Sequence, residues 1–273
     1  MAQNFYVHTD DFFIEKYTLK RPQNDMHYHH SYEVYYVLEG EREYFVGDRF
    51  FKVGKSDLVW VPKDMLHRTD GKGATRILMF FNDEFLSKYY REEILHYVVK
   101  SEPFVFHADS KNDELLHTYF KQLLAEYEAQ TAPDGVRNEL VLAGYLFQIL
   151  FLLQSADNTY VPPDTGDRRI SDIVKYINEN YMHISSIEEI AERFFISKYY
   201  LCHIFRESLG VPFITYLNTI RIRAACEMIK SSDYKLTEIA TKSGFNSLPY
   251  FCKVFKDEKG VTPTAYRKKV SRK

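Results

Sequence analysis

A helix-turn-helix pattern occurs twice in the last hundred residues of this 273-residue chain, about fifty residues apart. In each copy a short apolar helix is followed by a break and by a second helix that begins after a serine, Ser197 or Ser247. The matching positions are Ile187, Glu189, Ile190, Ala191, Ser197, Tyr200, Cys202, Phe205 and Gly210 against Leu236, Glu238, Ile239, Ala240, Ser247, Tyr250, Cys252, Phe255 and Gly260. This arrangement presents the second helix of each copy to a major groove of DNA.

Charge divides the chain into a basic part and an acidic part, although the formal net charge of the whole is −2. Residues 168 to 273 contain 19 Lys and Arg against 11 Asp and Glu, a balance of +8, and residues 1 to 167 carry −10. A basic domain gains affinity for phosphates by releasing counterions, whereas an acidic domain is repelled by DNA. The alternative is that the difference in charge has no role in binding and that the charged side chains only keep the surfaces of the two parts in contact with water.

The sequence predicts a reduced cytoplasmic protein that does not span a membrane. All three cysteines lie in the basic part and lack metal-site spacing, and the first residues, MAQNFYVHTDDFF, lack a signal-peptide pattern. The longest apolar run, 140–153, is shorter than the ~18 residues that a spanning helix needs and is interrupted by glycine and glutamine. We expect it to form a buried or partner-facing helix.

Residues 1 to about 81 contain short runs rich in Val, Tyr, Phe and Trp, separated by turns with glycine or aspartate. The runs are 33–38, 42–46, 49–53 and 57–61. Such spacing suits a small antiparallel barrel or jelly roll. Apolar stripes then predict helices at 83–100, 112–130 and 134–154, and the polar, proline-containing segment 155–167 is expected to be a linker.

In each helix-turn-helix copy the serine is expected to cap a reading helix whose apolar stripe turns inward. The inward stripes are Leu201, Ile204 and Phe205 in the first copy and Phe251, Val254 and Phe255 in the second. The outward positions are Lys198, Tyr199, Cys202, His203 and Arg206, and then Leu248, Pro249, Cys252, Lys253 and Lys256. Between the copies, 213–229 predicts one continuous helix, which would hold the reading helices at the ~34 Å that separates successive major grooves.

These features resemble the DNA-binding domain of the AraC/XylS family of bacterial transcription regulators, over residues 168–269. The second copy carries the family signature in Glu238-Ile239-Ala240, Gly244-Phe245, Phe251, Val254-Phe255-Lys256, Gly260, Thr262-Pro263 and Tyr266-Arg267. The resemblance implies base contacts from Tyr199, Cys202 and His203 and from Leu248, Pro249, Cys252 and Lys253. Few of these are Arg, Asn or Gln, so we expect contact with thymine methyls and shape readout to contribute more than usual. For the two cysteines, packing near the backbone is an equal alternative.

A second motif lies in the acidic part of the chain. The segment from His27 through His29 to Glu33 is followed by six residues and Gly40, and Pro62 is followed by His67. The pattern resembles the two motifs of the cupin superfamily, HxHxxxExxxxxxG and PxxxxH. It departs from the second motif, because Asp64 stands where the family usually has glycine and the later asparagine is missing.

Two uses of this motif remain open. Three imidazoles and a carboxylate, His27, His29, Glu33 and His67, would suit Mn, Fe, Ni or Zn. In regulators that pair this barrel with this DNA-binding domain, the resemblance instead implies a small-molecule pocket, commonly for a sugar, without a metal. We expect no cofactor, and an effector pocket lined by His27, His29, Glu33, Tyr35, Trp60 and His67. Aromatic faces with a few polar groups suit a carbohydrate, although Tyr and Trp are also ordinary core residues.

The expected fold class is α+β: a cupin β-barrel or jelly roll, a helical hairpin, and an all-α domain of two helix-turn-helix units joined by a linker helix. Residues 1–154 would form the effector-binding and dimerisation domain, with the barrel at about 1–81 and helices at about 83–154, and 168–273 the DNA-binding domain. The expected function is that of a transcription regulator, acting as a homodimer on double-stranded DNA, and contacting RNA polymerase if it is an activator. The alternative is a metal-dependent cupin enzyme, an oxygenase or isomerase, fused to a DNA-binding tail.

Overall fold

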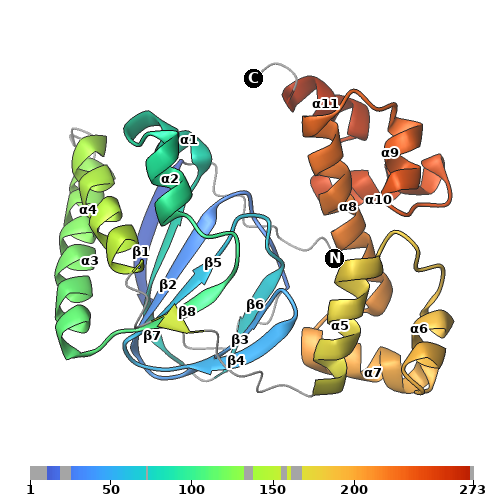
Figure 1. The fold of residues 1–273 in the computed structure, drawn as a ribbon, viewed down its shortest axis with the longest axis horizontal. Coiled ribbons are helices and arrows are strands. Elements are labelled where there is room, and N and C mark those ends of the chain that lie inside the picture. Colours follow the sequence, from blue (N-terminus) through green and yellow to red (C-terminus); the bar gives the residue numbers. More distant parts are fainter. Residues whose placement is uncertain are drawn as a thin grey trace. The chain divides into compact units, whose positions relative to one another are not determined.

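The computed structural model describes residues 11–18, 26–71, 73–131, 138–154, 159–160 and 168–270. Contacts divide the chain into two compact units, one of Asn4–Gly166 and one that contains Asp167–Lys273. We call the first the N-terminal unit and the second the C-terminal unit. Figure 1 shows sheets and helices together in the N-terminal unit and helices in the C-terminal unit. In its described residues the N-terminal unit has two sheets and four helices. The expected α+β fold class is confirmed.

The strands of the N-terminal unit form two antiparallel sheets. The larger sheet has six strands in the order β1-β7-β2-β5-β8-β9, and the smaller has three in the order β4-β3-β6. The strands are β1 (Phe12–Thr18), β2 (Tyr32–Glu39), β3 (Arg42–Val46), β4 (Arg49–Val53), β5 (Asp57–Val61), β6 (His67–Asp70), β7 (Thr75–Phe81), β8 (Phe104–His107) and β9 (Thr159–Tyr160).

The larger sheet is buried on both faces. On β2, Tyr35 and Val37 pack with residues of both sheets in one apolar cluster, which we call the barrel interior. Val34 and Tyr36 point to the opposite face and pack with residues of the helices, because successive side chains of a strand alternate between faces. Two buried faces explain why seven of the eight residues of β2 are buried, although a half-exposed strand would alternate with polar residues.

Four helices cover the outer face of the larger sheet: α1 (Asp83–Tyr89), α2 (Glu92–Val98), α3 (Ser110–Thr131) and α4 (Glu139–Leu152). The single helix predicted for 83–100 is wrong, because the chain turns between α1 and α2. Tyr90 there has an extended backbone, with φ −122° and ψ 142°, and its hydroxyl donates to the carbonyl of Ala143 on α4. Strand β8 also lies within the range predicted to be helical.

The predicted linker 155–167 lies largely outside the described residues. Its described part, Thr159–Tyr160, forms β9 and pairs with β8, with Tyr160 opposite Val105 and Thr159 opposite Phe106. These two residues therefore extend the larger sheet by one strand, a pairing between distant segments that composition does not predict.

The C-terminal unit contains seven helices in its described residues: α5 (Arg168–Asn180), α6 (Ile187–Arg193), α7 (Lys198–Leu209), α8 (Phe213–Ser231), α9 (Leu236–Lys242), α10 (Leu248–Lys259) and α11 (Pro263–Val270). The pairs α6–α7 and α9–α10 are the two helix-turn-helix copies, and α8 is the predicted continuous helix between them. In the described residues, none of the helices in either unit is long and apolar enough to cross a membrane.

Candidate DNA interface and ligand site

The two reading helices, α7 and α10, begin as the sequence predicts. The side chain of Ser197 accepts a hydrogen bond from the amide of Tyr200 at 3.1 Å, and that of Ser247 accepts one from the amide of Tyr250 at 3.3 Å. Each serine thus satisfies an amide at a helix terminus that would otherwise lack a partner. Pro249 lies in the first turn of α10, where its missing amide hydrogen costs little.

The predicted outward positions are on the surface, with one exception. Lys198, Tyr199, Cys202, His203 and Arg206 are exposed on α7; Leu248, Pro249, Lys253 and Lys256 are exposed on α10, where Cys252 is half-buried. The predicted inward residues of both helices are buried apart from Val254, which is half-buried against the core of the second copy. The two faces of each reading helix are therefore separated as expected.

Two of the outward basic residues of α7 have acidic neighbours. The ammonium of Lys198 lies 2.5 Å from Glu188 on α6, and this contact raises the pKa of Lys198. His203 lies 3.3 Å from Glu207, one turn further along α7. On this face of α7, Arg206 is the predicted basic residue with no acidic partner among the described residues. Sequence analysis selected neither pair, although the i, i+4 spacing of His203 and Glu207 is a signal that could have found the second.

A buried arginine on α8 joins the two copies, and the sequence analysis did not select it. Arg221 is 7% exposed. Its Nε donates to the carbonyl of Tyr181 at 3.0 Å, and its Nη2 donates to the carbonyls of Tyr181 and Ile184 at 2.8 and 2.5 Å. The guanidinium also lies 5.8 Å from the ring centre of Phe245, in the turn of the second copy. Arg221 thus contacts residues that precede the first copy and a residue inside the second.

In the N-terminal unit, the two cupin-like motifs meet at the barrel interior. His27, His29, Glu33 and His67 place one ligand-type atom each within 4.8 Å of all the others. His27 and His67 are brought together by a β-bridge, with backbone hydrogen bonds of 2.9 Å in both directions. Glu33 lies at the start of β2, and its Oε2 is 3.1 Å from Nε2 of His29 and 3.2 Å from Nε2 of His67.

Backbone carbonyls orient two of these imidazoles. Nδ1 of His29 lies 2.7 Å from the carbonyl oxygen of Ser31, and Nδ1 of His67 lies 2.8 Å from that of Met65. A carbonyl oxygen only accepts, so both Nδ1 atoms carry the hydrogen and both Nε2 atoms face the carboxylate of Glu33. A neutral imidazole would then direct a lone pair at an anion, so each contact needs either a proton on Nε2, which then donates to Glu33, or a cation that both residues bind. Such outer contacts to carbonyls are typical of metal-binding histidines, so the residues fit a divalent metal.

The electrostatics of Glu33 agree with a site that favours positive charge. Burial opposes its ionisation, but His67 and His29 outweigh burial and hold the pKa of Glu33 well below its usual range. The phenol of Tyr44 on β3, which sequence analysis did not select, donates to Oε1 of Glu33 at 3.4 Å. Burial and the nearby carboxylate raise the pKa of Tyr44, so it remains a donor.

The structure places Tyr35 in the barrel interior, beside Tyr44, but excludes Trp60 from it. Trp60 pairs with Val34 on β2, and therefore shares the outer face of the larger sheet. Its ring stacks on Tyr32 at 5.4 Å, and its Nε1 donates to the carbonyl of Lys100 at 3.0 Å. The predicted role of Trp60 in the pocket is wrong, because strand register decides the face and the sequence did not reveal the register.

The departure from the second cupin motif has a structural explanation. Asp64 has φ +61°, a left-handed conformation that glycine adopts readily and that aspartate tolerates better than most residues. Its backbone amide donates to the carbonyl of His29 at 2.8 Å, and its carboxylate lies 2.5 Å from Nδ1 of His30. The turn within the second motif therefore keeps the backbone shape that the missing glycine would adopt.

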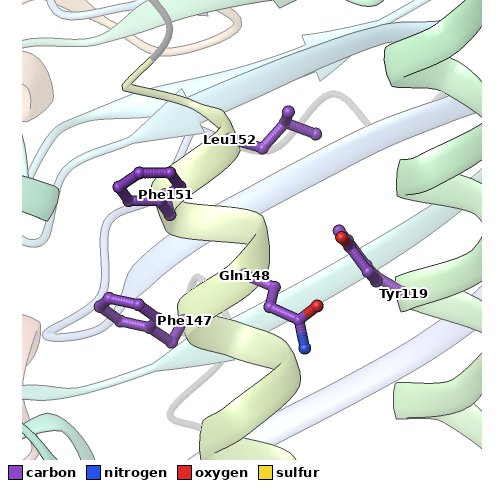
Figure 2. A pocket seen from close by; sticks show the side chains of 5 residues that line it. All are labelled: Tyr119, Phe147, Gln148, Phe151 and Leu152. Atoms are coloured by element: carbon purple, nitrogen blue, oxygen red, sulfur yellow. The ribbon is translucent and has the colours of Figure 1, made fainter.

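The outer helices carry an apolar surface of their own. Figure 2 shows a pocket between α3 and α4, where Gln148 extends toward Tyr119 and the rings of Phe147 and Phe151 lie along one side of α4. Phe151 is 58% exposed and Leu140, at the start of the same helix, is 71% exposed. Exposed apolar side chains of this size in one helix are typical of a contact surface.

Comparisons with known proteins identify both parts of the chain. A helix-turn-helix domain family matches residues 190–269, and a cupin domain family matches residues 16–81. The regulatory protein PocR of Salmonella typhimurium is 31% identical over 116 residues, which cover 42% of this chain and 38% of PocR. The uncharacterized HTH-type transcriptional regulator YfiF of Bacillus subtilis is 24% identical, covering 97% of this chain and 83% of YfiF.

A further regulator and a solved structure are also similar to this chain. The arabinose operon regulatory protein of Salmonella typhimurium is 25% identical over 156 residues, 57% of this chain and 55% of that protein. Among solved structures, ToxT of Vibrio cholerae is 17% identical and covers 96% of this chain and 98% of its own, with a TM-score of 0.40.

Proposed function

We propose that a small molecule in the barrel controls how a homodimer of this protein binds DNA. The support is that the chain belongs to the AraC family of transcription regulators and combines a cupin domain with a DNA-binding domain. Residues 1–154 would bind the effector and the second subunit, and residues 168–273 would bind DNA. Because it acts on DNA, we place the protein in the cytoplasm.

The arrangement of α7 and α10 on α8 supports the proposed mode of DNA binding. Both helices are capped in the same way, expose one face and bury the other, and belong to copies that Arg221 links through α8. We propose that the outward residues named above contact DNA, with Arg206 and Lys256 at phosphates and the residues that the resemblance assigns to base contacts, Lys253 among them, at bases. The matched caps and the separated faces of α7 and α10 are the observation that carries the proposal.

The cluster around Glu33 supports an effector site in the barrel. We propose that His27, His29, Glu33, Tyr35 and His67, with Tyr44 added by the structure, line it, and that the effector is a small hydroxylated molecule of the carbohydrate type. His27, His29, Glu33 and His67 would hold a divalent metal, if one binds. When bound, it would supply a Lewis acid for an oxygen atom of the effector.

We propose that the exposed apolar side chains of α4 form the contact between two subunits. Leu140 and Phe151 would be covered there, together with Phe147, whose ring stacks on that of Phe151 at 6.2 Å. A homodimer would present four reading helices to DNA. If the protein is an activator, RNA polymerase would be a further partner.

The second candidate function is a metal-dependent cupin enzyme fused to a DNA-binding tail, and the four-residue cluster is the observation that favours it. The relatives named above are transcription regulators or regulatory proteins, which favours the first candidate. Metal analysis of the purified protein, with oxygenase and isomerase assays in its presence, distinguishes the two. Turnover that is lost in a His27→Ala/His29→Ala/Glu33→Ala variant would support the enzyme.

The test of the regulator uses the same triple variant. It should bind duplex DNA like the wild type but should not respond to inducing growth conditions, because a ligand shifts an equilibrium only through contacts that differ between states. DNA binding by the wild type should weaken on the order of a hundredfold between low and moderate salt. A salt-independent affinity, or a normal response of a folded triple variant, would refute the corresponding part of the proposal.

A further inference from the structure

We propose that the effector carries an anionic group, a carboxylate or a phosphate, and that Arg76 in the barrel interior binds it. The inference rests on the proposed role of the barrel as the effector site and names the chemistry of the effector more closely. A sugar acid or a sugar phosphate would combine this anionic group with the hydroxyl groups expected above.

Arg76 lies on β7, where the next two interior side chains, Leu78 and Phe80, are apolar. It pairs with Tyr17 on β1 and with Val37 on β2, and it shares the interior face with Leu78, because residues two apart on a strand point the same way. The side chain is well inside the unit, since Arg76 is only 6% exposed. Its guanidinium lies 5.0 Å from the ring centre of Tyr35.

The guanidinium of Arg76 is not satisfied by the described residues. Nε and Nη1 are buried and have no hydrogen-bond partner, and no carboxylate of the described part of the chain forms an ion pair with it. Burying a charged group without partners is costly, and such a group persists when another function requires it. The ring of Tyr35 offers only a cation–π contact, which does not replace the missing acceptors.

Two carboxylates are buried among the described residues of the N-terminal unit, and both are occupied elsewhere. Glu33 is bonded to His29 and His67 at the cupin cluster. Asp57 accepts from the amide of Gly54 at 2.7 Å and lies 2.6 Å from Nδ1 of His107. Neither carboxylate neutralises Arg76, so the acceptor must come from outside the described residues.

A second buried arginine adds positive charge to the same region. Arg42 on β3 is 1% exposed, and it donates from Nη1 to the carbonyl of Gly71 at 3.1 Å and from Nη2 to Oγ1 of Thr69 at 3.2 Å. Both Arg42 and Arg76 act to lower the pKa of Tyr35, although burial has the larger, opposite effect. Two guanidinium groups beside one phenol make this part of the interior favourable for an anion.

A neighbouring arginine shows the contrast. Arg68, on β6, is also buried, but its Nη2 lies 3.2 Å from the carboxylate of Asp70. The chain therefore supplies an acid for a buried arginine on the outer face of the smaller sheet and none, among the described residues, for Arg76. The guanidinium of Arg76 also lies 5.9 Å from the ring centre of Tyr17, its neighbour on β1, which is 48% exposed.

The first test measures the thermal midpoint of the full chain without effector, after removal of metal and in chloride buffer. Arg76→Met should raise the midpoint by about 3 °C, because it removes an unsatisfied charge and keeps a side chain of similar length. Arg42→Met is the matched control and should lower the midpoint, because it removes donors from Gly71 and Thr69. A clear fall of the midpoint in Arg76→Met would show a structural role for Arg76 and overturn the proposal.

The second test uses acetate and inorganic phosphate as probes, each compared with chloride at equal ionic strength. Tens of millimolar of at least one probe should raise the midpoint of the wild type, and the same probe should leave Arg76→Met unchanged. Acetate would indicate an organic acid as the effector and phosphate a phosphate ester. No stabilisation by either probe, or equal stabilisation of both proteins, would overturn the proposal.

A third measurement separates this proposal from the function on which it rests. Arg76→Met should bind duplex DNA at low salt with the same affinity as the wild type, because the substitution lies in the other unit. If DNA binding is intact and the anion tests fail, the anionic effector is wrong and the regulator stands. If the wild type itself does not bind DNA, the proposed function fails first.

Discussion

Gly244 and Arg221 are in such close contact that residue 244 has no room for a side chain. A Cβ at residue 244 would lie 2.8 Å from Nε of Arg221, and 2.9 Å from both Cα and the carbonyl oxygen of Met182. The backbone of Gly244 also has φ +88°, in the left-handed region. The turn of the second helix-turn-helix copy is therefore closed against α8 and against the loop that precedes the first copy.

The first copy has the same turn with a different residue. Phe195 has φ +54°, and the amide of the next residue, Ile196, donates to the carbonyl of Ala191 as that of Phe245 donates to Ala240. Phe195 is 95% exposed, so its side chain meets no neighbour. The same left-handed backbone conformation thus occurs at Phe195, where the side chain is exposed to solvent, and at Gly244, where neighbouring atoms leave no room for one.

We predict that substitutions at Gly244 and Phe195 change the stability of the protein by very different amounts. Gly244→Ala should destabilise the protein by roughly 2–4 kcal/mol, because it adds both a left-handed alanine and a clash with backbone atoms. Phe195→Gly should change stability by less than about 1 kcal/mol, because it relieves a strained conformation and loses no packing. Denaturant unfolding of both variants measures the difference, and equal effects would contradict the role assigned to the contact with Arg221.

Arg221 should be needed for specific rather than general DNA binding. Arg221→Met leaves the carbonyls of Tyr181 and Ile184 without their donor and should cost about 2 kcal/mol of stability. At temperatures where the variant is folded, its affinity for the preferred DNA site should fall on the order of tenfold, and its affinity for random DNA should stay unchanged. Gel-shift titrations with both DNAs measure this, with Arg223→Met, two residues further along α8, as a control. A parallel loss on both DNAs would refute it.

The length of α8 should set the spacing of the reading helices. One alanine inserted after Ala224 rotates the following part of the helix by about 100° and lengthens it by about 1.5 Å. Specific binding should be abolished, while random DNA should still be bound, because binding to phosphates depends mainly on charge. Selection of preferred sites from a random DNA pool measures the outcome. An unchanged preferred site would mean that the two copies read DNA independently.

The two capping serines should each contribute about 1 kcal/mol to the stability of the C-terminal unit. Ser197→Ala and Ser247→Ala remove the acceptors for the amides of Tyr200 and Tyr250. Because the sites lie in different copies, the losses should add in the double variant. Thermal unfolding measures all three, and Ser208→Ala, inside α7, serves as a control. A loss in Ser208→Ala as large as in the cap variants would argue against capping as the cause.

Glu258 should make the C-terminal unit less stable at neutral pH than in mild acid. It lies on α10, its Oε1 has no hydrogen-bond partner among the described residues, and burial raises its pKa despite opposing effects of Thr219 and Lys259. A pKa raised on folding gives stability that is complete below the unfolded value, ~4.3, and lost as the pH rises through the folded value.

Replacing Glu258 by glutamine tests this directly. Glu258→Gln should be more stable than the wild type by about 1 kcal/mol at pH 7 and equal to it near pH 4, because the difference comes from ionisation of the buried carboxyl. Asp257→Asn is the matched control, since Asp257 is the exposed neighbour on the same helix. Thermal midpoints across this pH range measure the effect. A stability gain of Glu258→Gln that is equal at both pH values would contradict the explanation.

Local patterns determined most of the C-terminal unit. The caps at Ser197 and Ser247, the apolar stripes of α7 and α10 and the continuous helix α8 all follow from residues within a few positions of one another, because helices are built from contacts between near neighbours. The histidines and the glutamate of the cupin motifs were also identified from their spacing, and the structure brings them together.

Tertiary structure decided what depends on distant partners. Trp60 lies on a strand that the sequence predicts and Arg76 on one that it does not specify, and strand register places Trp60 on the outer face and Arg76, unpaired by the described residues, in the interior. The break at Tyr90, the added strand β9 and the contact of Gly244 with Arg221 likewise join segments far apart in the chain. The sequence by itself determined the helices, their caps and the candidate ligands. Pairing across long loops decided which side chains face the same space, because one residue of register moves a side chain to the other face of a sheet.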